Sequence, residues 1–481
     1  MSDIARVIGG RTNLGGRDVS IYGLIVFVTG LVALYTSHRC AIYAMMVFAL
    51  FGSTQAVGLG SIGILPAQLF LAFFAIRAFN LAGGKTLADA VSLDKPGFWL
   101  LCTCVWGVVG AILLPRLLLG STLVYPVDRS SQEVLLKPLG PVSGNLSQSV
   151  YCVSDVIVYC ATYAFLKYRG VYRTLANAIF VLAALDVVAG CLDIVFHAAG
   201  IDAMSAIKTA QFADLTGEEM GGLVRISGTF SETSAFSGFT LPLFIFCLNL
   251  WLVGYRTKIA GSLALATGIL LLLSTSGTAY VGLGAYAGVL VFSRPGVISR
   301  SAIARKQRLW VVGACAGLLV VLYVILFLPS VANAITDFFN TAVFSKAGSS
   351  SGVERMGWNA QGVTNFLDTY GIGVGLGSIR TSSFLIVVLA NLGVVGVVCY
   401  GMFLGTSLLT PIPSAYGFSE RAICYAARHG MIATLIVASA SAGVFELGAP
   451  FYIFAAAAGA LSPRVSRRTM ARARWVSQGG S

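Results

Sequence analysis

The sequence predicts an all-α, polytopic integral membrane protein that forms a single transmembrane domain over residues 1–481. Hydrophobic residues make up 57% of the chain and charged residues only 11%, whereas a soluble domain carries about a quarter charged residues. The mean hydropathy is +0.85, and apolar runs recur along almost the whole length. Such a chain is solvated by lipid rather than by water.

Most of the apolar runs approach the roughly 20 residues that a helix needs to cross a bilayer. Inside lipid every backbone polar group must be satisfied locally, so these runs are helices rather than isolated strands. We therefore expect about 12–14 transmembrane helices. The spans are 20–36, 40–57, 62–80, 97–118, 149–166, 174–196, 236–253, 259–274, 278–293, 309–329, 383–405, 429–445 and 448–462.

The net charge of +13 is a topology signal rather than a sign of nucleic-acid binding, because the basic residues gather in short connections, which stay cytoplasmic. This assignment places the loops near 119–148, 197–234 and 330–382 outside. Arg6, Arg11 and Arg17 favour an internal N-terminus, but counting helices back from the C-terminus puts it outside, and both orientations stay open. The basic residues in question are Lys167, Arg169, Arg173, Arg256, Lys258, Arg294, Arg300, Arg305, Lys306, Arg308, Arg464, Arg467, Arg468, Arg472 and Arg474.

Cysteine and histidine give no metal motif. Most of the ten cysteines fall within predicted helices and none forms a CxxC pair, which favours packing over metal binding or disulfides. His38, His197 and His429 are far apart in the sequence. We therefore expect no metal site and no cofactor.

The first candidate site is the segment "VRISGTFSETSAFSGF" at 224–239. Arg225 precedes a hydroxyl-rich run that includes Ser227 and Thr229, and Glu232 follows. A guanidinium, hydroxyl groups and the amides of the next helix can together bind an anion. The alternative is ordinary helix capping by Ser or Thr beside one solvated arginine.

The second candidate is "SGVERMGWNAQGVTNFLD" at 351–368. Ser351 and Glu354 have the spacing of a capping box, which predicts a helix start, and Gly371 is placed to end it. Arg355 and Asn359 share one face at i, i+4. We expect an external amphipathic helix on the membrane surface, in which the arginine is either functional or structural. Its apolar face contains Met356, Ala360, Val363 and Leu367.

The third candidate is "TYGIGVGLGSIRTSSF" at 369–384, in which glycine occupies every second position from 371 to 377. Side chains this small let a headgroup or a helix approach closely, so Gly373 and Gly375 are candidate substrate-binding residues. Arg380 follows, at the boundary of the next span. Arginine suits phosphate through its planar fork of donors, so a lipid-linked phosphate is the expected ligand of Arg225, Arg355 and Arg380.

Four acidic residues lie in or near the predicted spans, namely Asp155, Asp186, Asp193 and Glu446. An ionisable group within a membrane helix is a functional hypothesis by default. Asp193 and Glu446 fall close to the outer boundary, where a plain interfacial role is the alternative.

The segments "RISGTF", "LLLLSTSGTAYVGL", "ERMGWNA", "YGIGVGLGS" and "FLIVVLANLGVVGVV" together resemble the O-antigen ligase and O-antigen polymerase superfamily over roughly 220–405. The resemblance implies a glycosyltransferase fold of the C type in the bacterial inner membrane, with the active site facing the periplasm. It also implies a metal-independent reaction with a glycan on undecaprenyl diphosphate as donor, with Arg225 and Arg355 as diphosphate-binding candidates. Enzymes of this superfamily fit a chain-length co-polymerase as a partner. Nucleic acid is not expected as a partner.

Ligases of this superfamily usually carry a histidine after the glycine-rich segment, whereas this chain has Arg380 near that place. Arginine does not deprotonate and cannot act as a general base. We therefore favour a polymerase of exopolysaccharide, capsule or O-antigen repeats over the ligase alternative, and over a transporter or flippase of lipid-linked sugars. The hypothesis assigns catalysis to Arg225, Arg355 and the proton acceptor Glu232. Substrate binding is assigned to Arg380, Ser227, Thr229, Asn359, Gly373 and Gly375.

Overall fold

The computed structural model describes residues 12–13, 17–59, 62–127, 135–210, 219–220, 223–327 and 350–461. Parts of the three predicted external loops, at 128–134, 211–218, 221–222 and 330–349, lie outside the described residues, as does the end of the predicted span at 328–329. The basic cluster from Arg464 to Arg474 lies outside them as well.

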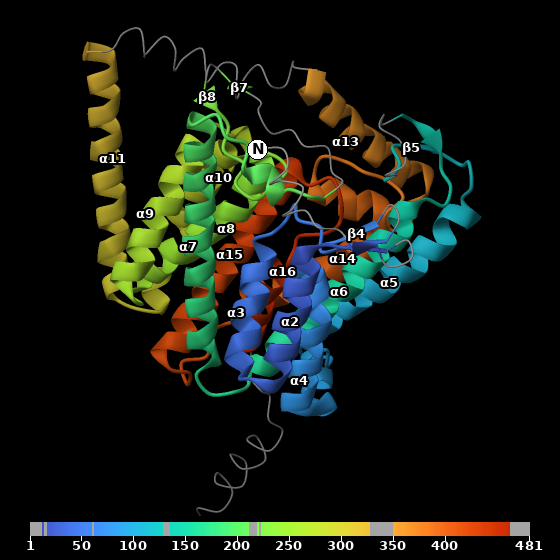
Figure 1. Cartoon of the computed structure of the whole chain (residues 1–481), viewed down its shortest axis with the longest axis horizontal. Coiled ribbons are helices and arrows are strands. Elements are labelled where there is room, and N and C mark those ends of the chain that lie inside the picture. Colours follow the sequence, from blue (N-terminus) through green and yellow to red (C-terminus); the bar gives the residue numbers. More distant parts are fainter. Residues whose placement is uncertain are drawn as a thin grey trace, which may run out of the picture.

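The described residues form a helical bundle in which each predicted apolar span corresponds to one helix (Figure 1). Seven of these helices are long and apolar enough to cross a membrane, and four shorter helices are also apolar. This confirms a multi-pass helical membrane protein. The helices are α2 (Ile21–Tyr35), α3 (His38–Ala49), α4 (Pro66–Ala90), α5 (Pro96–Leu117), α6 (Ser143–Leu166), α7 (Val171–Ala198), α8 (Thr233–Val253), α9 (Thr257–Leu273), α10 (Gly277–Phe292), α11 (Ser301–Phe327), α13 (Ser350–Asp368), α14 (Phe384–Leu409), α15 (Phe418–Ser441) and α16 (Ala449–Gly459).

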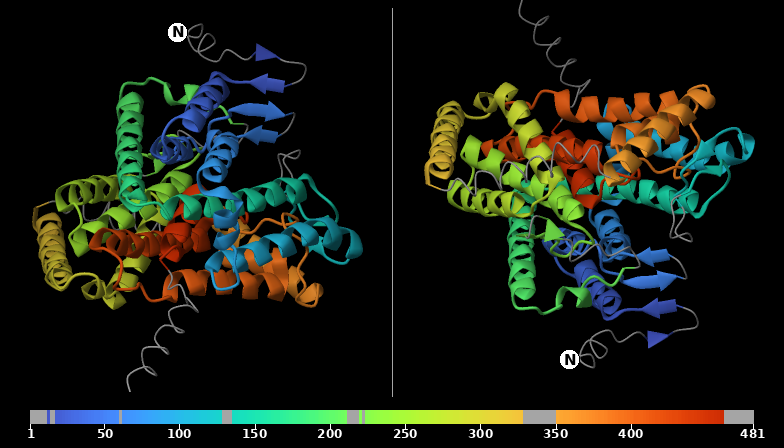
Figure 2. Two further views of the ribbon diagram at one scale, coloured as in Figure 1. Left: turned by 90° about the horizontal axis from the view of Figure 1, so that it is seen from below. Right: turned by 90° about the horizontal axis from the view of Figure 1, so that it is seen from above.

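Burial separates the inner helices of the bundle from its lipid-facing ones. Helix α8 lies inside, because 72% of its apolar window is buried, and it packs on α15 and α9. Helix α11 lies at one lateral edge (Figures 1 and 2). Large apolar side chains on the outward faces are exposed, among them Leu24, Ile112 and Leu385. Continuous exposed apolar surface of this kind is stable in lipid and not in water.

Short strand pairs, which the sequence did not predict, occur in the connections between helices. A four-stranded antiparallel sheet has the order β1-β2-β3-β4, and β5-β6 and β7-β8 are two-stranded. The four-stranded sheet lies beside α2 at one edge of the bundle (Figure 2). The strands are β1 (Thr12–Asn13), β2 (Arg17–Val19), β3 (Val57–Leu59), β4 (Ile62–Ile64), β5 (Leu123–Val124), β6 (Lys137–Pro138), β7 (Glu219–Met220) and β8 (Leu223–Val224).

The long connections meet at one end of the bundle, which we call the loop end. The Thr54 hydroxyl donates to the Ile207 carbonyl at 2.7 Å, and the Arg380 amide donates to the Tyr125 carbonyl at 2.9 Å. Strand β2 pairs with β3 at this end, so the chain enters the bundle from the side of the long connections. Which side of a membrane this end faces, and with it the orientation of the N-terminus, stays a prediction.

The short connections with their basic residues meet at the opposite end, which we call the basic end. Arg305 donates to the Leu252 carbonyl and Lys306 to the Ser293 carbonyl. Arg421 donates to the Val297 carbonyl. Many cationic side chains thus cover the helix ends there, as the positive-inside rule expects of a cytoplasmic face.

Candidate functional site

The glycine-rich loop between α13 and α14 owes its alternation to backbone conformation. Gly371, Gly373, Gly375 and Gly377 have φ of 78°, 90°, 97° and 78°, values that residues with a Cβ rarely adopt. The intervening residues, such as Val374 and Leu376, are fully buried. The loop is therefore a packed element of the core rather than a flexible hinge.

Close backbone approach is the second reason for glycine in this loop. A Cβ on Gly373 would lie 2.7 Å from the Gly393 nitrogen, and one on Gly375 would lie 2.7 Å from the Gly110 carbonyl oxygen. A Cβ on Gly377 would overlap the backbone of Gly144. The loop thus seats directly on the backbones of α14, α5 and α6.

The amides of the loop are used within the protein. Gly393 interrupts α14 with φ 63° and ψ −164°, and the loop pairs with the unwound segment. The amides of Val374 and Gly375 donate to the carbonyls of Ala390 and Asn391 at 2.9 and 3.0 Å. The Gly373 amide donates to Thr369 Oγ1 at 3.2 Å. The structure accounts for Gly373 and Gly375 without a ligand, and their role in substrate binding stays a prediction.

Arg380 stands at the end of this loop, outside the membrane-spanning helices. Its guanidinium carbon lies 4.5 Å from the centre of the Trp358 ring on α13, a distance typical of a cation–π contact. Burial lowers the pKa of Arg380, Glu354 and Glu232 raise it, and Arg355 lowers it. These charges therefore lie near one another, and we call Arg380, Arg355, Trp358, Glu354 and Glu232 the arginine corner.

Helix α13 has the amphipathic character that the sequence predicts. The apolar side chains Met356, Val363 and Leu367 are exposed at 53%, 39% and 65%. Toward the bundle, Asn359 Oδ1 accepts the Ser382 amide at 2.8 Å, and Asn365 Nδ2 donates to the Leu123 carbonyl at 2.6 Å. Asn359 thereby fixes the segment that follows Arg380, while the apolar face is left for lipid.

The loop at 225–232 is anchored by Asp193 at the end of α7. The carboxylate oxygen Oδ2 of Asp193 accepts the amides of Ser227 and Gly228 at 2.8 and 2.9 Å. Lys208 donates to the Ser227 hydroxyl, and the Thr229 hydroxyl donates to the Leu50 carbonyl at 2.6 Å. Both hydroxyl side chains are buried, and the structure accounts for them without a ligand.

Glu232 and Arg225 flank this anchored loop. Glu232 occupies the N-cap of α8 in an extended conformation without capping it, and the Ser234 hydroxyl donates to its Oε1. Its charge acts on Arg380, although the two residues are far apart in the sequence. Arg225 is half-buried at the start of the loop. Glu232 and Arg355 thus lie within electrostatic range of Arg380, and Arg225 lies in the segment leading to Glu232.

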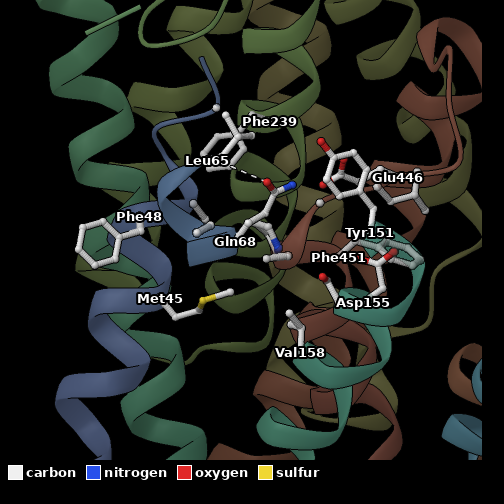
Figure 3. Close-up of a pocket in the computed structure, with 18 of the residues that line it drawn as sticks. Met45, Phe48, Leu65, Gln68, Tyr151, Asp155, Val158, Phe239, Glu446 and Phe451 are labelled. Carbon is white, nitrogen blue, oxygen red and sulfur yellow. Dashed lines mark hydrogen bonds between the residues drawn. The ribbon is translucent and has the colours of Figure 1, made fainter. Parts of the chain in front are cut away.

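A cavity of about 210 Å³ lies inside the bundle near the loop end. Figure 3 shows Tyr151 and Asp155 of α6 on one side with Glu446, and Gln68 of α4 facing them. Aromatic side chains, among them Phe239, cover much of the remaining wall. In the sequence, Asp155 and Glu446 are acidic residues in or near predicted membrane spans, but nothing in their spacing indicates that they share a cavity.

The cavity and the arginine corner are joined through the backbone. The Thr381 amide, next to Arg380, donates to the Gly443 carbonyl at 3.3 Å, and Glu446 follows three residues later. Phe230, in the loop between Arg225 and Glu232, lines the cavity. The two candidate sites are therefore neighbours built from the same loops.

Within the described ranges, no three or more His, Cys, Asp or Glu side chains are grouped to hold a metal ion. His429, one of the three histidines, is buried with its Nδ1 2.7 Å from the Tyr286 hydroxyl, and is thus committed to a contact between α15 and α10. Comparison of the chain with protein-family models and with curated proteins finds no match.

Proposed function

We propose that this protein is a metal-independent membrane glycosyltransferase that polymerises a bacterial envelope polysaccharide. It transfers the glycan from undecaprenyl diphosphate to a lipid-linked repeat unit at the periplasmic face of the inner membrane. The observation that carries this proposal is the arginine corner, in which Arg355 and Arg380 lie close enough for their charges to interact. Two neighbouring guanidinium groups at a membrane boundary suit a diphosphate.

The electrostatics of the corner favour an anionic ligand. Arg380 is partly desolvated and the charge of Arg355 opposes its own, so its pKa is lowered. A phosphate oxygen brought between the two guanidinium groups relieves this repulsion and forms charge-assisted hydrogen bonds. The Trp358 ring under Arg380 holds the plane of the guanidinium for such a contact.

The position of α13 supports a ligand presented by the bilayer. Its exposed apolar face matches an interfacial helix with its apolar side in the headgroup and acyl boundary. Trp358 on the same helix contacts Arg380. A diphosphate carried on a polyprenyl chain reaches this depth without leaving the membrane, whereas a nucleotide sugar would arrive from water.

The reaction that follows is an inverting displacement. The acceptor hydroxyl oxygen bonds to the anomeric carbon of the donor while the bond to the diphosphate oxygen breaks, and Glu232 accepts the hydroxyl proton. Arg355, Arg380 and Arg225 stabilise the negative charge that develops on the leaving diphosphate, which is preorganised electrostatic catalysis. The Ser234 hydrogen bond to one oxygen of Glu232 orients the carboxylate and leaves its second oxygen for the proton.

A specific observation favours the polymerase over the ligase. The residue held on Trp358 at the end of the glycine loop is an arginine, which cannot serve as a base, and His429 is bound to Tyr286 inside the bundle. The carboxylate of Glu232 therefore takes the role of proton acceptor in the proposed mechanism.

The glycan of cells that lack this protein tests the proposal. We expect the undecaprenyl carrier to hold single repeat units instead of polymer, detected by mass spectrometry of extracted lipids. Expression of the intact chain should restore polymer. Long glycans on the carrier that fail to reach lipid A–core would establish the ligase, and normal glycans on both acceptors would refute the proposal.

A further inference from the structure

The cavity beside the arginine corner carries an inference of its own. Its polar side chains supply both hydrogen-bond acceptors and a donor. Asp155 and Glu446 supply carboxylate oxygens, and Gln68 faces them across the cavity (Figure 3). A ligand with several hydroxyl groups satisfies both kinds of partner at once.

Asp155 is the most informative residue of the cavity. It lies within α6 and is only 4% exposed; the Tyr452 hydroxyl group of α16 lies beside its carboxyl group, but its Oδ2 accepts no hydrogen bond of normal geometry in the described structure. A buried carboxyl group whose hydrogen bonding is incomplete is costly, and in a membrane helix such a group marks a functional site by default. A ligand hydroxyl group donated to Asp155 removes this cost.

The orientation of Gln68 is fixed by the fold. Its Oε1 accepts the Leu65 amide at 3.2 Å at the first turn of α4. The side-chain amide therefore presents Nε2, which can only donate, on its other side. A bound cation requires acceptors in every direction, so a donor facing the carboxylates disfavours a cation site.

The remaining wall is mostly apolar and partly aromatic. Phe230, Phe239, Phe451 and Tyr151 line the cavity from the 225–232 loop, α8, α16 and α6. Apolar walls with a few fixed polar groups are the usual make-up of a small-molecule site, and ring faces pack against the C–H faces of a sugar. The volume of about 210 Å³ equals roughly seven waters at about 30 Å³ each, which suits a single ring.

We propose that this cavity binds one neutral sugar ring of the lipid-linked glycan, with hydroxyl groups donating to Asp155 and Glu446 and accepting from Gln68. This rests on the proposed function, since the glycan is its substrate. The negative charge that Glu446 and Asp155 share in this small cavity repels a further anionic group, so uronic acids and phosphorylated sugars are excluded. Asp155 and Glu446 thus set the specificity for neutral sugars, while the arginine corner binds the charged end of the substrate.

Saturation-transfer NMR on the full-length protein in nanodiscs tests the proposal with D-glucose, D-galactose, D-mannose, N-acetyl-D-glucosamine and D-glucuronate as separate probes. We expect at least one neutral sugar to give a signal and glucuronate to give none. Asp155→Asn and Glu446→Gln should each weaken binding about tenfold or more, as loss of a charge-assisted hydrogen bond implies. Glu420→Gln, in the first turn of α15 at the basic end, is the matched control and should bind normally.

Thermal unfolding of each variant establishes that it is folded. Because Asp155→Asn and Glu446→Gln are independent isosteric changes, the test still holds if one of the two variants does not fold. The proposal is overturned if no neutral sugar binds the intact protein, if glucuronate binds equally well, or if both variants bind normally. If sodium raises the unfolding temperature of the intact protein more than choline does, if both variants lose this effect, and if no sugar gives a signal, the cavity is a cation site instead. If the protein binds sugar but does not elongate glycans, the proposed function is refuted and the sugar site is still supported.

Discussion

Replacement of Gly375 by alanine tests the packing of the glycine loop on the helices. Gly375 has a φ of 97°, where an L-residue costs about 1–2 kcal/mol. Its new Cβ would lie 2.7 Å from the Gly110 carbonyl oxygen and 2.9 Å from Cδ of Pro115, and overpacking of this kind costs about 1–3 kcal/mol. We therefore expect Gly375→Ala to lower the free energy of unfolding by about 2–5 kcal/mol.

Gly120→Ala provides the matched control for this change. Gly120 has a similar φ of 70°, but a Cβ there meets no atom within 4 Å. Only the backbone term of about 1–2 kcal/mol applies, so the difference between the two variants isolates the contact with α5. Unfolding of both proteins in one detergent, followed by circular dichroism, measures that difference. Equal destabilisation of the two variants would refute the reasoning that the loop is seated on the α5 backbone.

Two further predictions concern the anchoring of the loop end. Asp193→Ala leaves the buried amides of Ser227 and Gly228 without their acceptor, which costs about 1–3 kcal/mol of stability for each amide. Thermal unfolding should therefore show a large loss of stability. A variant as stable as the intact protein would contradict the anchoring role of Asp193. The second prediction uses an environment-sensitive fluorophore on a single cysteine, introduced at Leu367 or at Glu354 in a protein without exposed native cysteines. The fluorophore at Leu367 should report lipid and the one at Glu354 should report water. Equal emission from both positions would contradict an interfacial α13.

The sequence was sufficient to locate the helices because lipid imposes a local rule on them. A run long and apolar enough to cross the bilayer must be helical, and the spans near 97–118 and 383–405 correspond to α5 and α14. The amphipathic pattern of α13 is likewise local, since its apolar face follows from residues three and four apart.

What sequence alone did not indicate depends on contacts between distant segments. The alternation of glycines from Gly371 to Gly377 left open whether a headgroup or a helix approaches the loop, and the structure shows three helices whose backbones pack against it. The contact of Arg380 with Trp358 and the shared cavity of Asp155 and Glu446 also join segments that only the tertiary fold brings together. The short strands could not be predicted, because two or three residues in a loop show no periodic pattern of hydrophobicity.

Glycan elongation by the purified protein tests the central claim most directly. With lipid-linked repeat units in nanodiscs, without added metal and with EDTA present, the intact protein should produce a ladder of longer glycans on gel electrophoresis. Arg355→Ala and Arg380→Ala should abolish the ladder although both proteins remain folded in thermal unfolding. Arg380→Lys should retain part of the ladder because the positive charge remains, and Arg300→Ala at the basic end should elongate normally. Unchanged repeat units with the folded intact protein, or a normal ladder from both alanine variants of the corner, would contradict the account.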